Sequence, residues 1–264
     1  MIIEVKKRQY LEIDNRIKEY QSLIKNQIAS FREIKSFIGK INYQLKIMPN
    51  QTRIKLKDKK YLINKKLIQT DLYPMIHAII SIIISDKNNA FIHSSVVSKN
   101  KKGILIVGTF GQGKTTLALE MEKKGFEINS ADHAHLYLTK NKLFMKLGSA
   151  YLKYQEKSKF LDKEKIISFI EIKEIIMICG MCDKGKCKKD VITDKNYIVK
   201  YLFPSLNWWT NSPIITDPNV ILFNPKHKEM FSFLMKLAKI KKRVYMLRGD
   251  KRKISFEVSK LIRK

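Results

Sequence analysis

The stretch Lys102-Gly-Ile-Leu-Ile-Val-Gly-Thr-Phe-Gly-Gln-Gly-Lys-Thr115 joins an apolar run to a glycine-rich loop. The apolar residues Lys102–Val107 predict a buried strand, and residues 115–124 predict a helix that closes at Gly125. Between them lies the pattern G-x(4)-G-K-T, whose meaning depends on this strand–loop–helix context. The order of the three pieces predicts an α/β fold organised around the loop.

The glycines of the loop let backbone N–H groups point into one concavity, which suits phosphate oxygens. The start of the helix adds unpaired N–H donors and the positive end of the helix dipole. We expect Lys114 to bridge terminal phosphates and Thr115 to place its hydroxyl on Mg²⁺. The sequence therefore predicts a site for ATP or another nucleoside triphosphate, formed by Gly108, Thr109, Phe110, Gly111, Gln112, Gly113, Lys114, Thr115 and Thr116.

Length and composition set the broad class of the chain. Its 264 residues suit one domain, alone or with a small appendage, and a hydrophobic fraction of 44% is enough for a real core. The three cysteines argue against a disulfide framework. The N-terminus lacks the apolar region of a signal peptide, and no apolar stretch approaches the ~20 residues of a membrane span. We therefore expect a cytoplasmic protein without a membrane span.

The formal net charge of +29 is high for a chain of this length. Such a charge attracts phosphate-bearing or acidic partners, among them nucleotides, nucleic acid, anionic membranes and acidic peptides. The alternative is a compositional bias that spreads lysines over solvated faces. We favour the bias, because lysine outnumbers arginine and few basic clusters contain aromatic residues. Nucleic acid is therefore a less favoured partner than an acidic protein or peptide.

The N-terminal segment predicts a long amphipathic helix over residues 10–38, closed by Gly39, because apolar residues recur there at spacings of three and four. This helix would either form a coiled coil that makes a homo-oligomer or lie along the protein's own core, and we favour the core. Residues 41–68 alternate like strands and predict a small accessory sheet, with turns at Pro49-Asn50 and Lys57-Asp58. We therefore expect residues 1–70 to form a helix with an accessory β region, and residues 71–264 to form the phosphate-loop domain.

The rest of the chain interleaves strands and helices. Asp71 is expected to cap a helix that runs to about Ser85, with Pro74 in its first turn. Because several strands come as hairpins, we expect a mixed β-sheet flanked by helices. The other predicted strands cover residues 91–97, 135–139, 143–147, 197–203 and 243–247, and one more strand ends at residue 128. The other predicted helices cover residues 162–177, about 226–239 and the C-terminus.

An acidic residue follows the strand after the first helix. In Phe126-Glu-Ile-Asn-Ser-Ala-Asp132 the aspartate comes just past the strand end, which should bring it close to the phosphate loop. Such a carboxylate can hold Mg²⁺ or take a proton from an attacking hydroxyl. The alternative is an ordinary turn aspartate.

These motifs occur in an order that resembles the HPr kinase/phosphorylase family over about residues 71–138. The series is Ile92-His-Ser-Ser-Val-Val97, then Gly103-Ile-Leu-Ile-Val-Gly108 with its loop, then Ser130-Ala-Asp-His133. The resemblance implies an HPr-kinase/PEP-carboxykinase-like core and ATP-dependent phosphorylation of a serine hydroxyl in a protein or peptide. It also implies that Asp132 is the catalytic base and binds the metal with Thr115, while His93 faces the phosphates.

The chain departs from the family at its acidic pair, where only Asp132 is acidic and the second position is Ala131 or His133. A histidine does not reproduce the charge of a second carboxylate at neutral pH. This departure favours an alternative function, a nucleotide-binding regulatory or assembly module with little catalysis. A third hypothesis, a nucleic-acid- or nucleoside-directed P-loop kinase, is favoured by the net charge.

Three cysteines lie close together in Cys179-Gly-Met-Cys-Asp-Lys-Gly-Lys-Cys187. A zinc site would need a fourth ligand from a distance, such as His135 or His227. Neighbouring lysines would instead lower the thiol pKa values and favour a redox pair. The third interpretation is a set of ordinary thiols. Because the pattern is incomplete, we assign no metal ligand from it.

Overall fold

The structure, a computed structural model, describes residues 1–14, 21–48, 55–57, 60–64, 69–154, 157–207 and 226–262. The described residues up to Ile84 form one compact unit, and those from Ser85 onward form a second. This division falls later than the expected one at residue 70. The reason is that helix α2 (Gln69–Ile84) packs against α1 (Gln21–Ile28) and β1 (Ile2–Lys6), which both belong to the first unit.

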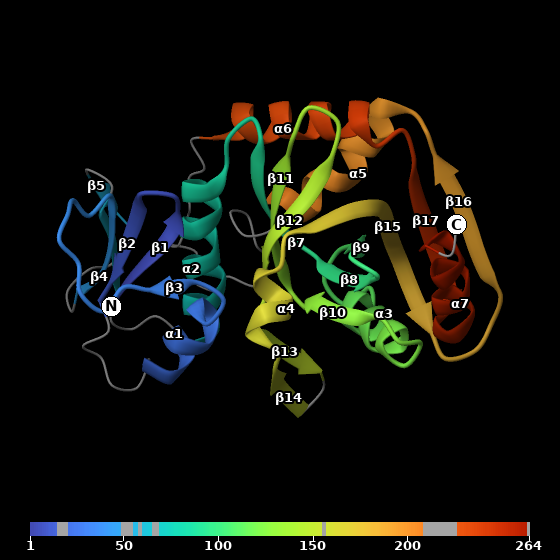
Figure 1. Cartoon of the computed structure of the whole chain (residues 1–264), viewed down its shortest axis with the longest axis horizontal. Helices are drawn as coiled ribbons and strands as arrows, with labels where there is room; N and C mark the ends of the chain where they lie inside the picture. The colour runs from blue at the N-terminus through green and yellow to red at the C-terminus, as the bar shows by residue number, and fades with distance from the viewer. Residues whose placement is uncertain are drawn as a thin grey trace. The chain divides into compact units, whose positions relative to one another are not determined.

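The first unit contains a six-stranded sheet with the strand order β3-β1-β2-β4-β6-β5 (Figure 1). The accessory sheet expected over residues 41–68 is confirmed by its last three strands, although the turn at Pro49-Asn50 lies outside the described residues. The remaining strands are β2 (Gln9–Ile13), β3 (Arg32–Glu33), β4 (Tyr43–Met48), β5 (Lys55–Lys57) and β6 (Lys60–Asn64).

The prediction of a long helix over residues 10–38 is wrong. Leu11 and Ile13 are both buried in strand β2, so burial there follows the two-residue period of a strand. Of the described residues in the range, only those of α1 are helical, while Ile38 is fully exposed and Gly39 closes no helix. The homo-oligomer proposed through this segment therefore loses the long helix on which it depended.

The second unit is built on a nine-stranded mixed sheet, as expected. Its main order is β10-β8-β9-β15-β12-β11-β7, and β17 lies between β15 and β16 (Figure 1). Strand β15 runs parallel to β9 and to β17, and the other pairs are antiparallel. The strands are β7 (Asn89–His93), β8 (Ser95–Lys99), β9 (Lys102–Val107), β10 (Glu127–Ser130), β11 (His133–Leu138), β12 (Leu143–Gly148), β15 (Ile170–Cys182), β16 (Cys187–Ile192) and β17 (Val244–Asp250).

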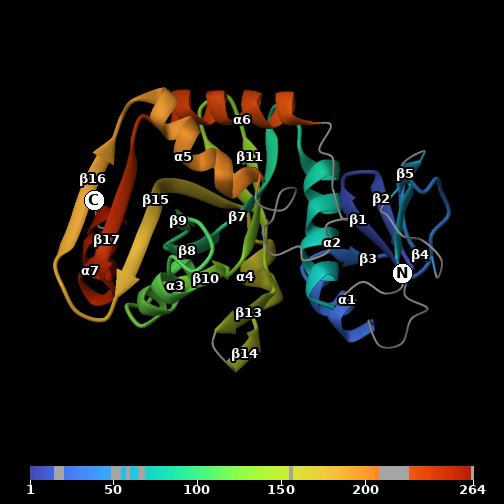
Figure 2. The same ribbon diagram turned by 180° about the vertical axis from the view of Figure 1, so that it is seen from behind.

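Helices cover both faces of this sheet (Figure 2). Along β9, Ile104 and Ile106 pack in a core with α3 (Lys114–Glu122) and α7 (Lys251–Ile262). Leu105 and Val107 belong to the other core, with α5 (Lys195–Asn207) and α6 (His227–Ile240). Because β9 is buried on both faces, its end at Val107 is held in place by packing. The phosphate loop, residues 108–115, begins directly after it. A small two-stranded sheet, β13 (Tyr151–Tyr154) with β14 (Lys157–Phe160), stands apart from the main sheet.

Two elements of this unit differ from their predictions. The helix expected over residues 162–177 is only α4 (Lys163–Ile167), and most of that range belongs to β15. The four consecutive residues from Ile175 to Ile178 are buried, which is typical of a parallel strand covered on both faces. The strand expected over residues 197–203 is helix α5, whose Ile198, Leu202 and Leu206 are buried at a spacing of four.

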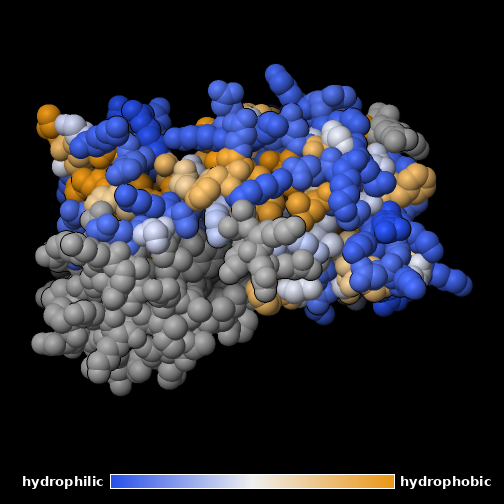
Figure 3. All heavy atoms as spheres, turned by 90° about the horizontal axis from the view of Figure 1, so that it is seen from below, coloured by the Kyte–Doolittle hydropathy of each residue, from blue (hydrophilic) through white to orange (hydrophobic). Residues whose placement is uncertain are grey.

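The strand expected over residues 91–97 is two strands, β7 and β8, because the chain bends at Ser94, whose N–H donates to the Asp132 backbone oxygen. The hairpin of β11 and β12, helix α6, strand β17 and the closing helix α7 are confirmed. No helix in the described part of the chain is long and apolar enough to cross a membrane. On the face that Figure 3 shows, hydrophilic residues make up much of the described surface, with hydrophobic patches between them.

Candidate functional site

The phosphate loop joins β9 to α3, as the sequence predicts. Gly113 immediately precedes the helix with a φ of 99°, and a Cβ there would lie 2.7 Å from the Met181 sulfur. Gly111 has a φ of 77°, but nothing lies within 4 Å of where its Cβ would be. Glycine is thus required at position 113 for conformation and close approach, whereas Gly111 borders open space.

Lys114 begins helix α3 and is only 6% exposed. Its Nζ donates hydrogen bonds to the backbone oxygens of Gly108, at 2.9 Å, and Thr109, at 3.0 Å. Burial lowers the pKa of this ammonium to about 8. No carboxylate in the described residues forms an ion pair with it. A buried cation that lacks a counter-charge is stabilised by a bound anion.

The start of α3 offers further donors to an anion. Its N-cap residue is Gly113, and no side chain makes a capping hydrogen bond there. The first N–H groups of the helix thus receive no capping acceptor, and they lie at the positive end of the helix dipole. Thr115 is half-buried in the same turn. These features and the open space at Gly111 fit a chain of phosphate groups.

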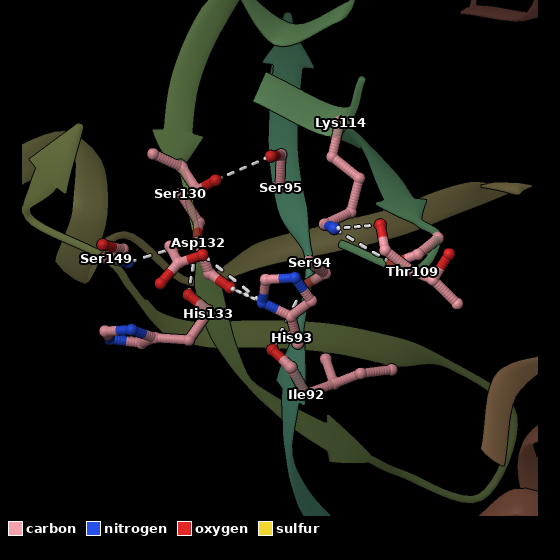
Figure 4. A network of polar contacts seen from close by, with 12 residues as sticks. Ile92, His93, Ser94, Ser95, Thr109, Lys114, Ser130, Asp132, His133 and Ser149 are labelled. Carbon is pink, nitrogen blue, oxygen red and sulfur yellow. Dashed lines mark hydrogen bonds and ion pairs between the residues drawn. The ribbon is translucent and has the colours of Figure 1, made fainter. Parts of the chain in front are cut away.

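A bend in two paired strands lies beside this loop. His133 of β11 lies opposite His93 of β7, and Ser130 of β10 lies opposite Val96 of β8. The two strand pairs therefore share one antiparallel register, although β7 and β8 are separated by a break, as are β10 and β11. At the breaks, the Ser94 N–H donates to the Asp132 backbone oxygen at 3.0 Å, and the Ser95 hydroxyl donates to the Ala131 oxygen at 2.8 Å. These bonds fix the backbone on both sides of the Asp132 carboxylate (Figure 4).

The far side of the bend is held by Ser130. Its hydroxyl donates to the backbone oxygen of His133 and accepts a hydrogen bond from the Ser149 N–H at 3.2 Å. Sequence reasoning missed this group of serines. The signal available was the repeated serine at strand ends, at positions 94, 95 and 130, because short hydroxyl side chains bond backbone groups where a strand ladder is interrupted.

The register places the bend at the level of the loop. Ser95 pairs with Ile106, so Ser94 and His93 lie level with Val107 and Gly108, the end of β9 and the start of the loop. Asp132 lies in the break between β10 and β11, and β10 is paired with β8, the neighbour of β9. At about 4.8 Å per strand, the Asp132 backbone is roughly 10 Å from the beginning of the loop. The loop, His93 and Asp132 therefore lie at one end of the sheet.

His93 and Asp132 are in direct contact (Figure 4). Nδ1 of His93 lies 3.3 Å from Oδ1 of Asp132 and 3.1 Å from its backbone oxygen, so this nitrogen, when it carries a proton, faces two acceptors. The His93 side chain is 6% exposed and that of Asp132 is 29% exposed. Partial burial among protein atoms disfavours the charged carboxylate and raises its pKa to about 7. A carboxylate with such a pKa is suited to proton transfer near neutral pH.

His133, the residue after Asp132, does not join this pair. Its imidazole packs on the ring of Phe91, with 4.7 Å between the ring centroids, and is 2% exposed. Figure 4 shows it pointing away from His93 and Asp132. His133 therefore does not replace a second acid, and Asp132 is the one carboxylate of the bend.

The cysteines are not arranged as the metal or redox hypotheses require. Cys179 and Cys182 lie on β15 and Cys187 on β16. Within the described ranges, no group of three or more histidine, cysteine, aspartate and glutamate residues could hold a metal. Burial raises the pKa values of the Cys179 and Cys187 thiols, which is the opposite of what a reactive thiol needs.

Comparison with known proteins adds a distant similarity. No protein-family model and no curated protein sequence matches the chain. Among solved structures, the Hpr(Ser) kinase/phosphatase from Coxiella burnetii is similar, with a TM-score of 0.34 and 13% sequence identity over 66% of this chain and 93% of that one. At this TM-score the similarity says nothing about the residues of the site, whose assignment rests on the loop and the bend.

Proposed function

We propose that the chain is a kinase, which binds a nucleoside triphosphate on residues 108–115 and transfers the terminal phosphoryl group to a hydroxyl acceptor. One observation carries the proposal. The buried Lys114 ammonium, at an uncapped helix start, lies at the same end of the sheet as a carboxylate whose pKa is about 7. A cation for phosphate and a base for a hydroxyl are the two groups that phosphoryl transfer needs.

The loop and the start of α3 would hold the phosphates. Their N–H groups would donate to the phosphate oxygens, while Lys114 would move its hydrogen bonds from the Gly108 and Thr109 oxygens to the terminal phosphates. The hydroxyl of Thr115 and the carboxylate of Asp132 would hold Mg²⁺, because oxygen atoms are the ligands that this ion prefers. When bound, Mg²⁺ neutralises negative charge on the phosphate oxygens.

Asp132 would act as the base in the transfer. The acceptor hydroxyl gives its proton to the carboxylate as its oxygen forms a bond to the terminal phosphorus. The bond from that phosphorus to the bridging oxygen breaks, and the nucleoside diphosphate leaves. Lys114 stabilises the charge on the transferred group. His93, through Nδ1, orients the carboxylate and is a positioning residue in this scheme.

We propose a serine hydroxyl of a protein or peptide as the acceptor, following the resemblance to HPr kinases in residues 92–133. The net charge of +29 would favour an acceptor with acidic residues near the hydroxyl. The bend has a single carboxylate, that of Asp132, and this supports a second candidate, a nucleotide-binding regulatory module with little catalysis. His133 does not take the place of a second acid, because its ring packs on Phe91 and points away from Asp132.

The two candidates differ in one assay. The protein is incubated with Mg²⁺, ATP labelled on its terminal phosphate, and extract of the source cells. The kinase predicts a labelled protein or peptide that is lost with the Asp132→Asn variant and retained with Lys124→Met, an exposed lysine in the turn after α3. ATP that binds but labels no acceptor under these conditions would contradict the kinase and support the regulatory module.

A further inference from the structure

A groove of about 390 Å³ runs along helix α3 beside the phosphate loop. One wall is a single face of the helix, because residues 116, 119, 120 and 123 are spaced by three and four. The other wall comes from Tyr154, at the end of β13, and Lys251, at the start of α7. The lining residues are Thr116, Leu119, Glu120, Glu122, Lys123, Tyr154 and Lys251.

The groove begins where a nucleotide bound to the loop would continue. Thr116 lines it and directly follows Thr115. Because Lys114 and Thr115 would hold the terminal phosphates and Mg²⁺, the remainder of the molecule would extend past Thr116. The groove also lies near the carboxyl ends of the parallel strands β9, β15 and β17, since α7 follows β17 directly. This edge is where α/β sheets bind their ligands.

The charges of the groove are already paired. Lys251 Nζ lies 2.5 Å from Asp183 Oδ1, and Lys123 Nζ lies 2.7 Å from Glu120 Oε1. The remaining acid, Glu122, pairs with Lys159 at 3.0 Å. Two acids and two lysines line the groove, so it carries no excess charge for a further phosphate. It suits an uncharged group with polar edges.

The walls of the groove have the chemistry of a nucleoside site. Leu119 and Tyr154 both pack against the core that contains α3 and α7, so they offer apolar surfaces held in place. The Glu120 side chain is 14% exposed and can accept hydrogen bonds from hydroxyl or amino groups. Glu120, Tyr154 and Lys251 all line this groove. The hydrogen bond from Lys251 to Asp183 chiefly raises the pKa of Lys251, so this lysine stays charged and paired.

The geometry points to this groove as the site of the ribose and base of the nucleotide, with Leu119 and Tyr154 flanking the base and Glu120 accepting from the ribose hydroxyls. The volume is within the range of about 300–1,000 Å³ that small-molecule sites have. The inference rests on the proposed function, because it requires the phosphates to occupy residues 108–115.

The test compares ATP with tripolyphosphate, which has the phosphates without the nucleoside. Binding of each, with Mg²⁺, is measured by calorimetry for the whole chain and for Leu119→Trp, which fills the groove, and Tyr154→Ala, which removes a wall. Both variants should weaken ATP binding about tenfold or more, as loss of base stacking does, and leave tripolyphosphate binding within about twofold. The matched control is Tyr197→Ala, a 53% exposed tyrosine on α5, which should change neither affinity.

The outcomes separate this inference from the proposed function. If tripolyphosphate binds and both folded variants keep ATP affinity within about twofold of the unchanged chain, the groove is not the nucleoside site, although the phosphate site stands. If neither ATP nor tripolyphosphate binds the unchanged chain, the proposed function fails and the groove inference fails with it. Thermal unfolding of each variant shows that it is folded, and Tyr154→Ala decides the question if Leu119→Trp does not fold.

Discussion

The Nδ1 atom of His93 lies 3.3 Å from the carboxylate and 3.1 Å from the backbone oxygen of Asp132. The same ring nitrogen thus contacts both the side-chain carboxylate and the backbone carbonyl of the residue that we propose as the base. The contact spans the break between two strand pairs, where serine side chains hold the backbone. The position of the base is therefore determined by the sheet rather than by a free loop.

The first prediction concerns catalysis by Asp132. Asp132→Asn removes the proton acceptor with little change of shape, so the rate of phosphoryl transfer should fall by about 10²–10⁴-fold, the usual contribution of a general base. Affinity for Mg²⁺-ATP should also weaken, because the variant lacks the carboxylate that would hold Mg²⁺. At subsaturating ATP, where the rate reports the free protein, the rate in the unchanged chain should rise with pH through about 7, the pKa of this carboxyl. Single-turnover rates between pH 5 and pH 9 measure this, and an unchanged rate in the variant would show that Asp132 is not the base.

The second prediction concerns stability. The pKa of Asp132 is raised from 3.8 to about 7, so the folded state holds a proton that the unfolded state releases between these values. The free energy of unfolding should therefore fall as pH rises from about 4 to about 7. Asp132→Asn removes this dependence and should be more stable than the unchanged chain at pH 8, by about 1–3 kcal/mol after allowance for solvent at a partly exposed group. Urea unfolding of both proteins at pH 5 and pH 8 measures the change, and an equal difference at the two pH values would contradict it.

The third prediction separates positioning from direct chemistry at His93. In His93→Asn the amide N–H can take the place of Nδ1–H, whereas His93→Leu has no donor. We expect the transfer rate to fall about 10–100-fold in the leucine variant and less in the asparagine variant. ATP affinity should be similar in both. Equal loss of rate in the two variants would mean that His93 acts through its other ring nitrogen and is more than a positioning residue.

The fourth prediction concerns the pH dependence of nucleotide binding. Burial lowers the pKa of Lys114 to about 8 in the free protein, and bound phosphate would raise it again. Above pH 8, binding must therefore take up a proton, and Kd for ATP should rise up to tenfold per pH unit. Lys114→Arg keeps its charge at these pH values, so its Kd should not rise between pH 8 and pH 9.5 even if it is weaker. Calorimetry over this range tests the prediction, which a flat Kd in the unchanged chain would contradict.

Local patterns in the sequence were sufficient for the phosphate loop and its neighbours. Glycines at fixed positions between an apolar run and a helical run predict a strand, a loop and a helix in this order. The structure has β9, the loop and α3 in that order, with positive φ at Gly108, Gly111 and Gly113. The prediction of a helix over residues 10–38 is wrong because apolar spacings of three and four there extend over a strand, β2, and a short helix, α1. The prediction of a helix over residues 162–177, most of which belong to β15, is wrong for a related reason. A continuous apolar run fits a buried helix and a strand covered on both faces equally well.

The sequence also placed Asp132 beside the loop, but it gave no sign of the bend that holds it. That bend depends on pairing between strands some forty residues apart, as in the contact of Ser95 with Ala131. The direction of the His133 ring depends on Phe91, a residue of another strand. Long-range pairing of this kind is set by the whole sheet, so a local pattern does not reveal it.

Binding of Mg²⁺ and ATP to Lys114→Met, measured by calorimetry beside the unchanged chain and Lys124→Met, tests the central claim most directly. The unchanged chain and Lys124→Met should bind one ATP per chain with similar affinity. Lys114→Met should bind about 100-fold more weakly or not at all, because several charge-assisted hydrogen bonds are lost. Equal ATP affinity in all three folded proteins, or no ATP binding by the unchanged chain, would contradict a nucleotide site on this loop.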